Sequence, residues 1–170
     1  MTIHDALRKQ AQQLAIQDPR KPVQVSLRRA ISAAYYALFH LLIDAAIRRL
    51  VAAEPRLRLG TLVSRAFAHG EMRKVSKAFA AGTPPAAFAA VAGPVPRELQ
   101  RVADAFVSLQ EARHDADYNV GRSFSRHETL VLLRKAEEAF AEWKGLRVQG
   151  LPAVDAYLTA LLIGQLVRAS

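Results

Sequence analysis

An arginine stands at a position where an apolar helical pattern calls for a buried side chain. Four apolar residues follow one another at steps of three, four and three positions, namely Leu99, Val102, Phe106 and Leu109. This spacing is typical of one apolar helix face, and the next position on that face is Arg113. Because arginine is rarely buried without a partner, we expect Arg113 to face a paired group, a cavity or a subunit interface.

Polar and aromatic side chains surround Arg113 in the string RHDADYN, residues 113–119. Asp117 follows Arg113 by four residues, so a helix places both side chains on one face. His114 and Tyr118 are related in the same way on the adjoining face. An Arg113–Asp117 pair that only ends a helix would explain the two charges. We favour a functional site, because these four groups follow the apolar face without a break.

A second polar stripe runs along the helical segment that contains the most apolar part of the chain. Its members recur at steps of three or four positions, namely Arg29, Ser32, Tyr36, His40 and Asp44. An isolated histidine in such a segment is usually a hydrogen-bonded core residue, but here Tyr36 and Asp44 lie about one turn from His40 on either side. Because buried polar groups need partners, we expect the Arg113 region to face this stripe.

Helical periodicity accounts for nearly the whole chain, and no segment has the alternation of a strand. We expect helices at about 2–17, 23–53, 96–118, 126–146 and 151–168, with two shorter helices in 57–81 that break near Gly70. A capping box of Ser125 and Glu128 opens the helix that ends near Leu146. The Pro- and Gly-rich segment 81–96 is expected to be an irregular loop.

These elements predict an all-α fold, with one domain over residues 1–170. Its antiparallel bundle core covers about 10–145, and an additional C-terminal helix covers about 151–168. Apolar residues in this last helix exceed what a peripheral helix needs, namely Val154, Leu158, Leu161 and Leu162. Together with the position of Arg113, they predict a homodimer.

Composition limits the classes of function. The chain has no cysteine, which excludes disulfides, thiolate catalysis and zinc ribbons. Its net charge of +9 favours an anionic partner, either a nucleic acid or an acidic protein. The N-terminal residues lack a signal-peptide pattern, and the apolar run 158–163 is too short to span a membrane. We therefore expect a cytoplasmic protein with no membrane contact.

Two stretches of the sequence resemble the HEPN family. SLRRAISAAYYALFH, residues 26–40, resembles the early core helix of that family with its RRA-S-AYYA-FH pattern. LQEARHDADYN, residues 109–119, resembles the later helix, where many bacterial members carry R-x-x-ADY. The order and separation of the two stretches agree with the family, and the resemblance covers about residues 10–145.

The resemblance implies a helical bundle that dimerises and, in active members, a metal-independent RNase without cofactors. Such members use an arginine to stabilise phosphorane charge and, after four to six intervening residues, a histidine as acid or base. Many members pair with a minimal nucleotidyltransferase in toxin–antitoxin modules. Arg113 and the polar His114 match the motif, but residues 118–120 are Tyr, Asn and Val. A second string, RSFSRH at 122–127, has the Arg-x4-His spacing but lies outside the apolar face.

These observations lead to an assignment of site residues. The catalytic candidates are Arg113, His114, Asp117, Tyr118 and His40, with His114 or His40 as the proton-transfer group and Tyr118 orienting a phosphate. The candidates for RNA binding are Arg29, Tyr36 and Arg122. The predicted function is RNA binding, with endoribonuclease activity as part of a toxin–antitoxin pair. The alternative is a non-catalytic dimer that serves as a protein or RNA interaction module.

Two other classes fit the sequence less well. A ferritin-like metal bundle needs Glu-x-x-His motifs paired on facing helices, and the chain has no such pair, so we expect no metal site. The predicted short helices around Gly70 could imitate a DNA-binding helix-turn-helix. Their basic residues are more often a solvated face, and they comprise Arg65, His69, Arg73, Lys74 and Lys77.

Overall fold

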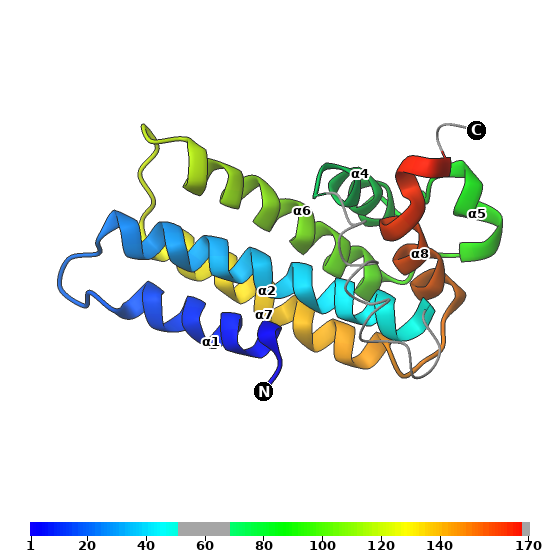
Figure 1. Cartoon of the computed structure of the whole chain (residues 1–170), viewed down its shortest axis with the longest axis horizontal. Helices are drawn as coiled ribbons and strands as arrows, with labels where there is room; N and C mark the ends of the chain where they lie inside the picture. The colour runs from blue at the N-terminus through cyan, green and yellow to red at the C-terminus, as the bar shows by residue number, and fades with distance from the viewer. Residues whose placement is uncertain (51–68, 168–170) are drawn as a thin grey trace. The chain divides into compact units, whose positions relative to one another are not determined.

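The computed structural model describes residues 1–50 and 69–167. This part of the chain is helical and contains no strand, which confirms the predicted all-α fold (Figure 1). The helices are α1 (Ile3–Ile16), α2 (Gln24–Leu50), α4 (His69–Ala80), α5 (Ala86–Ala92), α6 (Arg97–Tyr118), α7 (Arg126–Leu146) and α8 (Pro152–Val167). The bounds agree with the predicted long helices to within a few residues.

The described helices fall into two compact units. Unit 1 comprises residues 1–40 and 105–140, which are α1 with parts of α2, α6 and α7. Unit 2 comprises the described residues of 41–104 and 141–170, which include α4, α5 and α8. The boundaries therefore fall inside three helices and not in linkers. Every residue of the predicted site belongs to unit 1, whereas Asp44, the last member of the polar stripe, belongs to unit 2.

The core of unit 1 forms where α2 meets the end of α6 and the segment that follows it. Leu27, Ile31, Ala112, Ala116 and Phe124 make one buried cluster. Of the apolar face predicted from Leu99 to Leu109, Phe106 and Leu109 belong to this unit and are fully buried, as the spacing requires; Leu99 and Val102 are fully buried in unit 2. Each buried leucine or phenylalanine contributes about 1.5–3 kcal/mol relative to its exposed state. This burial fixes which face of α6 points inward and so carries Arg113 toward α2.

Helix α2 is apolar on nearly all sides. Residues 24–49 are long and apolar enough to cross a membrane, although 61% of the most apolar window is buried inside the protein. The core helix of a soluble bundle passes the same test, so this is weak support for a membrane span. Burial on several sides explains why polar residues on this helix have protein partners.

The ends of α1 and α7 show how local sequence starts each helix. Thr2 and Asp5 form a full capping box at α1. At α7, Ser125 Oγ accepts from the backbone N–H of Glu128 at 3.0 Å, as predicted. The second half of that predicted box is wrong, because the Glu128 carboxylate accepts from Arg122 at 2.6 Å instead. The capping residue was predictable, whereas the competing arginine was not.

The segment 81–96 is not an irregular loop throughout, which corrects the prediction. Helix α5 occupies its centre, and Phe88 and Ala92 are buried there. Pro85 immediately precedes the first helical residue, and Gly93 follows the last one with φ +61°. The proline and glycine residues therefore bound a short alanine-rich helix of high intrinsic propensity. Helix α4 contains Gly70 in its first turn, and the other helix predicted near it, at 57–68, lies outside the described residues.

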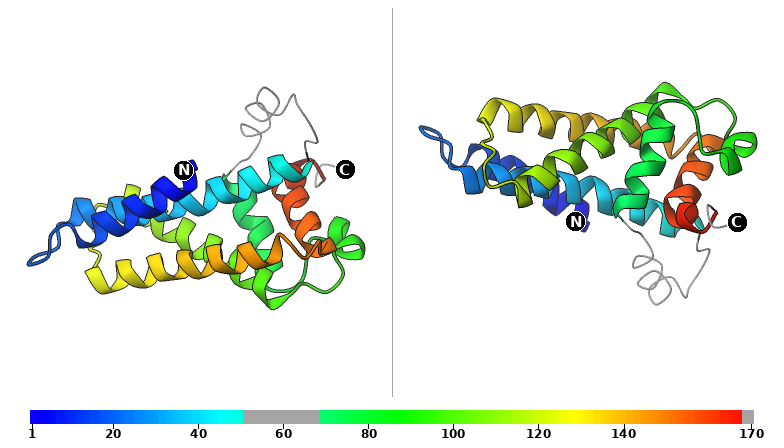
Figure 2. Two further views of the ribbon diagram at one scale, coloured as in Figure 1. Left: turned by 90° about the horizontal axis from the view of Figure 1, so that it is seen from below. Right: turned by 90° about the horizontal axis from the view of Figure 1, so that it is seen from above.

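The apolar residues of α8 are used inside the chain. Helix α8 packs against α4 and α5, as both views of Figure 2 show. Val154, Leu158 and Leu161 are buried by this packing. The prediction that α8 has apolar surface to spare is therefore wrong for these residues, and it no longer supports a homodimer.

A buried hydrogen bond joins α4 to α8 in unit 2. Ser76 Oγ and Tyr157 Oη lie 2.8 Å apart, and both residues are fully buried. Burial raises the pKa of the Tyr157 hydroxyl, so it stays protonated. One of the two hydroxyls donates and the other accepts in this bond, away from water.

We expect Tyr157→Phe and Ser76→Ala each to lower the free energy of unfolding by about 1–3 kcal/mol, since each strands one buried hydroxyl. The double variant should lose less than the sum, because it strands neither. Urea unfolding of the four proteins measures the cycle. Additive losses would show that the two hydroxyls do not interact.

Candidate functional site

The guanidinium of Arg113 is held on two sides in unit 1. Its Nη2 donates to the Tyr36 hydroxyl at 2.8 Å. Its Nε lies 2.7 Å from Asp117 Oδ2, but the N–H does not point at that oxygen, so the contact is an ion pair without a hydrogen bond. The side chain of Arg113 is 17% exposed and that of Asp117 is 30% exposed. The pair predicted from the sequence is therefore formed at the edge of the core and not deep inside it.

A second contact ties the same helices together. Asp117 Oδ1 accepts from Ser32 Oγ at 2.6 Å. Ser32 and Tyr36 are four residues apart on α2, and Arg113 and Asp117 are four residues apart on α6. Ser32 and Tyr36 of α2 thus contact Asp117 and Arg113 of α6, respectively. The prediction that part of the α2 stripe partners the Arg113 region holds for Ser32 and Tyr36.

Three tyrosine rings surround the Arg113 cation. Its Cζ lies 5.8 Å from the ring centroid of Tyr35, 5.4 Å from that of Tyr36 and 5.5 Å from that of Tyr118. Burial alone would lower the pKa of Arg113, but Tyr36, Asp117 and Tyr118 together outweigh it and raise the pKa. The arginine therefore stays charged, and the ring faces favour that charge electrostatically.

The Nη1 nitrogen of this fixed guanidinium, which carries two N–H donors, is still open. Nη1 hydrogen-bonds to none of the described residues, and it is not among the buried unpartnered atoms, so water reaches it. Arg29 lies one turn before Ser32 on α2, is exposed, and forms no ion pair or hydrogen bond within the described part of the chain. By its spacing, Arg29 belongs to the same stripe of α2 as Ser32 and Tyr36, whose hydroxyls contact Asp117 and Arg113. This arrangement fits an anionic oxygen.

The end of α6 is held in place by a residue that the sequence reasoning missed. Arg28 donates to the backbone carbonyls of Ala116 at 2.7 Å and Asn119 at 3.0 Å, and also to that of Arg122. Ala116 lies in the last turn of α6, where carbonyls lack helical partners. Asn119 and Arg122 lie in the segment that follows, and the Asn119 carbonyl also accepts from the Arg122 backbone N–H at 3.2 Å. The clamp fixes the backbone on both sides of Tyr118. The only signal in the sequence was the adjacent arginine pair Arg28-Arg29.

Arg122, predicted as a binding residue, has structural partners. Its guanidinium pairs with Asp115 and with Glu128, and its Cζ lies 4.7 Å from the ring centroid of Phe124. The Gln24 amide also donates to the Phe124 carbonyl at 2.7 Å and accepts from its N–H at 2.9 Å. These contacts explain Arg122 as an anchor of the segment after α6, without a ligand.

The two candidate histidines lie at different edges of the cluster. The His114 ring is exposed and packs beside Tyr118, with centroids 5.1 Å apart. The His40 ring lies 6.5 Å from that of Tyr36 and 5.4 Å from that of Phe39. Burial lowers the pKa of His40, and the nearby His4 lowers it further. Within the described residues, no hydrogen bond joins either histidine to Arg113.

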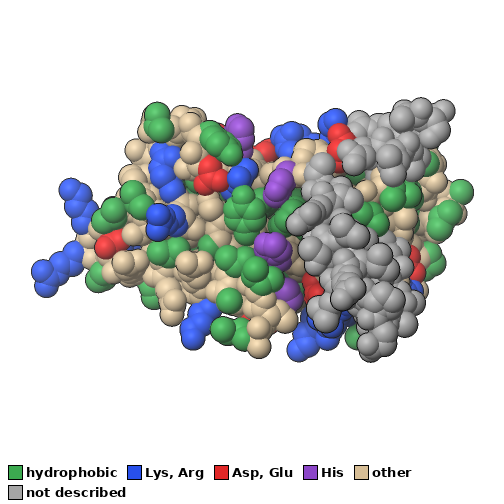
Figure 3. Space-filling model, viewed as in Figure 1, with side chains coloured by type: hydrophobic (Ala, Val, Ile, Leu, Met, Phe, Trp, Pro, Cys, Tyr) green, Lys and Arg blue, Asp and Glu red, His purple; other side chains and the backbone are tan. Residues whose placement is uncertain are grey.

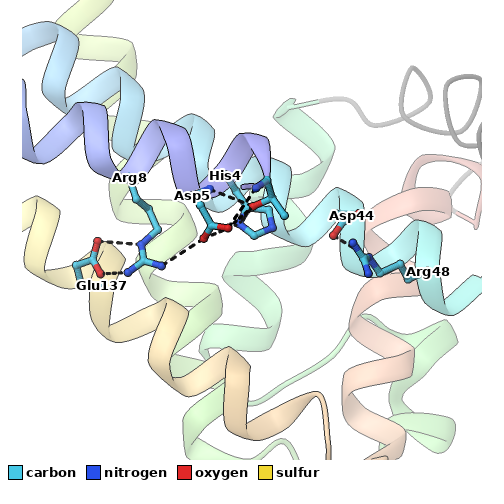
Figure 4. A network of polar contacts seen from close by, with 7 residues as sticks. His4, Asp5, Arg8, Asp44, Arg48 and Glu137 are labelled. Atoms are coloured by element: carbon cyan, nitrogen blue, oxygen red, sulfur yellow. Dashed lines mark hydrogen bonds and ion pairs between the residues drawn. The ribbon is translucent and has the colours of Figure 1, made fainter.

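Asp44 does not belong to the Arg113 cluster, and the described residues offer no metal site. Asp44, the last member of the α2 stripe, belongs to unit 2, where it pairs with Arg48 at 2.9 Å (Figure 4). The described residues contain no group of three histidine or carboxylate side chains that could hold a metal ion. The ring of Tyr35, which the sequence reasoning did not single out, is part of the cluster, and its hydroxyl has a pKa raised by burial.

We expect Arg113→Met to lower the free energy of unfolding by about 1–3 kcal/mol, because it leaves a partly buried carboxylate without its cation. Asp117→Asn should cost about 1 kcal/mol or less, since Arg113 keeps Tyr36 and Ser32 keeps an acceptor. The matched control is Arg48→Met, which breaks an i,i+4 pair whose arginine side chain is 67% exposed, and it should change little. If chemical unfolding showed that Arg113→Met loses no more stability than Arg48→Met, this explanation of the Arg113–Asp117 pair would be contradicted.

The lowered pKa of His40 predicts a pH dependence of stability. In the unfolded chain His40 protonates near pH 6.5, while the folded protein resists that proton. The unfolded state therefore binds more protons as the pH falls through about 6.5, and folding stability is lost. Urea unfolding from pH 8 to 5 should show His40→Gln losing less stability than wild type, while His127→Gln, at an exposed histidine, should follow wild type. Parallel curves for wild type and His40→Gln would contradict the effect.

The sequence matches no family model and no curated protein, and the structure matches no solved structure. What the Arg113 cluster can do chemically therefore follows from its own geometry.

Proposed function

We propose that this chain is a HEPN-like RNA-binding protein that holds an RNA phosphate at Arg113. The observation that carries the proposal is a guanidinium fixed by Tyr36 and Asp117 that keeps Nη1 open to solvent. A side chain already held in place loses little conformational freedom when it binds. Arginine presents its donors in a planar fork that suits phosphate oxygens.

The charges around the cluster favour an anion. Arg113 and Arg29 bring two positive charges, and Asp117 brings one negative charge that already faces Arg113 and Ser32. On the coloured part of the face in Figure 3, Lys and Arg side chains stand singly, with acidic side chains between them. The net charge of +9 attracts a polyanion at long range, but binding at one place depends on the local arrangement.

Cleavage of RNA is a second candidate function, favoured by one observation. The lowered pKa of His40 keeps its imidazole neutral at pH 7, which is the form that a general base requires. Its ring adjoins Tyr36, which itself holds Arg113. Against cleavage, no histidine occupies residues 118–120, where the family pattern has one. Binding therefore explains more of the cluster than cleavage does.

The remaining expectations stay predictions. They are the homodimer, a nucleotidyltransferase-type antitoxin as partner and a cytoplasmic location. The alternative function, a non-catalytic dimer that recruits another protein, would use the same bundle but would not need the open donors of Arg113 and Arg29.

We expect wild type to bind a labelled single-stranded RNA in a fluorescence anisotropy titration, with an affinity that falls as salt rises. Arg113→Met should weaken binding by about tenfold, which corresponds to about 1.4 kcal/mol. Arg29→Gln should lower the slope of log affinity against log salt by about 0.7, since it removes one phosphate contact. The matched control is Arg134→Gln, which removes an exposed arginine of α7 that forms no ion pair or hydrogen bond with the described residues.

Equal losses in Arg113→Met and Arg134→Gln would mean that net charge alone binds RNA, which would contradict the proposal. The same RNA, incubated with wild type and a chelator, tests cleavage. Products that disappear in both Arg113→Met and His40→Gln would support a metal-independent RNase. An intact RNA that still binds would support binding alone.

A further inference from the structure

Tyr118 exposes a large aromatic ring at the end of α6, beside the Arg113 cation. It is 64% exposed at the last residue of α6, whereas Tyr35, Tyr157 and Phe106 are fully buried. The ring of His114, which is also exposed, lies 5.1 Å away at an interplanar angle of 49°. Two adjacent exposed rings at a helix end contribute little to a core. Their position is better explained by a ligand with a flat face.

The position of the Tyr118 ring is also fixed by neighbouring residues. Arg28 holds the backbone on either side of it through Ala116 and Asn119. The Cζ of Arg113 lies 5.5 Å from its ring centroid. The open donors of Arg113 and the open surface of Tyr118 are therefore neighbours at a fixed separation. A ligand that offers an anion and a flat ring side by side would engage both.

We propose that an unpaired base stacks on Tyr118 while a phosphate of the same strand binds Arg113. The inference rests on the proposed function and narrows its substrate class to single-stranded nucleic acid. Unpaired bases expose their faces to aromatic side chains, whereas the bases of a duplex are already stacked on each other. A purely apolar partner fits less well, because the charged Arg113 and Asp117 adjoin the ring.

The test compares binding of one sequence as single-stranded RNA, as single-stranded DNA and as duplex RNA. Tyr118→Phe keeps the ring face and should bind within about twofold of wild type. Tyr118→Leu keeps apolar bulk without the ring and should bind either single strand about tenfold more weakly. Duplex RNA should bind more weakly than the single strand and should not respond to Tyr118→Leu. The control is Val120→Ala, at another exposed apolar residue of this end, which should bind like wild type.

A direct readout avoids reliance on affinity alone. In Tyr118→Trp the added indole is exposed, whereas the native Trp143 is buried. Base stacking should quench the added fluorescence as single-stranded RNA saturates the protein, and thermal melts should show that all Tyr118 variants remain folded.

Wild-type affinity in Tyr118→Leu, or equal affinity for duplex and single strand, would overturn the stacking proposal. If RNA binding then still depended on Arg113, the proposed function would stand and only the stacking would fail. If wild type bound no nucleic acid at low salt, both would fail.

Discussion

An arginine whose side chain is only 17% exposed has to have its charge balanced inside the protein, and the local structure of unit 1 follows from that requirement. The buried apolar face of α6 carries Arg113 against α2, where water no longer surrounds it fully. Tyr36 and Asp117 replace the lost hydration, and Ser32 in turn satisfies Asp117. Because burying a charge without such partners costs several kcal/mol, the register between the two helices is set by these polar groups as well as by the core.

The Arg113 guanidinium also keeps N–H donors for which the described residues provide no acceptor, and these donors matter for function. Its Nε and Nη2 face protein groups, while Nη1 faces solvent. Water satisfies the open N–H groups in the free protein, and an anionic oxygen of a ligand can replace that water. The same end of α6 presents Tyr118 to solvent on a backbone that Arg28 holds firmly. Fixed side chains with open binding groups are what a binding site requires, because little conformational freedom is lost when the ligand arrives.

Much of the fold was predictable because long helices with regular apolar spacing dominate the chain. The pairing of Arg113 with Asp117 was also predictable, since it depends only on a four-residue step. The rings around Arg113 and the clamp by Arg28 were not, because they depend on how α2 approaches α6 in three dimensions. Helix α5 was not predictable in the same way. Proline and glycine are typical of irregular loops, but here they only bound the helix at Pro85 and Gly93.

The central claim is that Arg113 itself binds RNA, and nitrogen–proton NMR of arginine side chains tests it most directly. The Nε–Hε signal of Arg113, identified by its absence in Arg113→Met, should shift as a short single-stranded RNA is added. The shift should saturate with the same affinity as the anisotropy titration. A signal that stays unchanged while the RNA is fully bound would contradict the claim and place the RNA elsewhere on the protein.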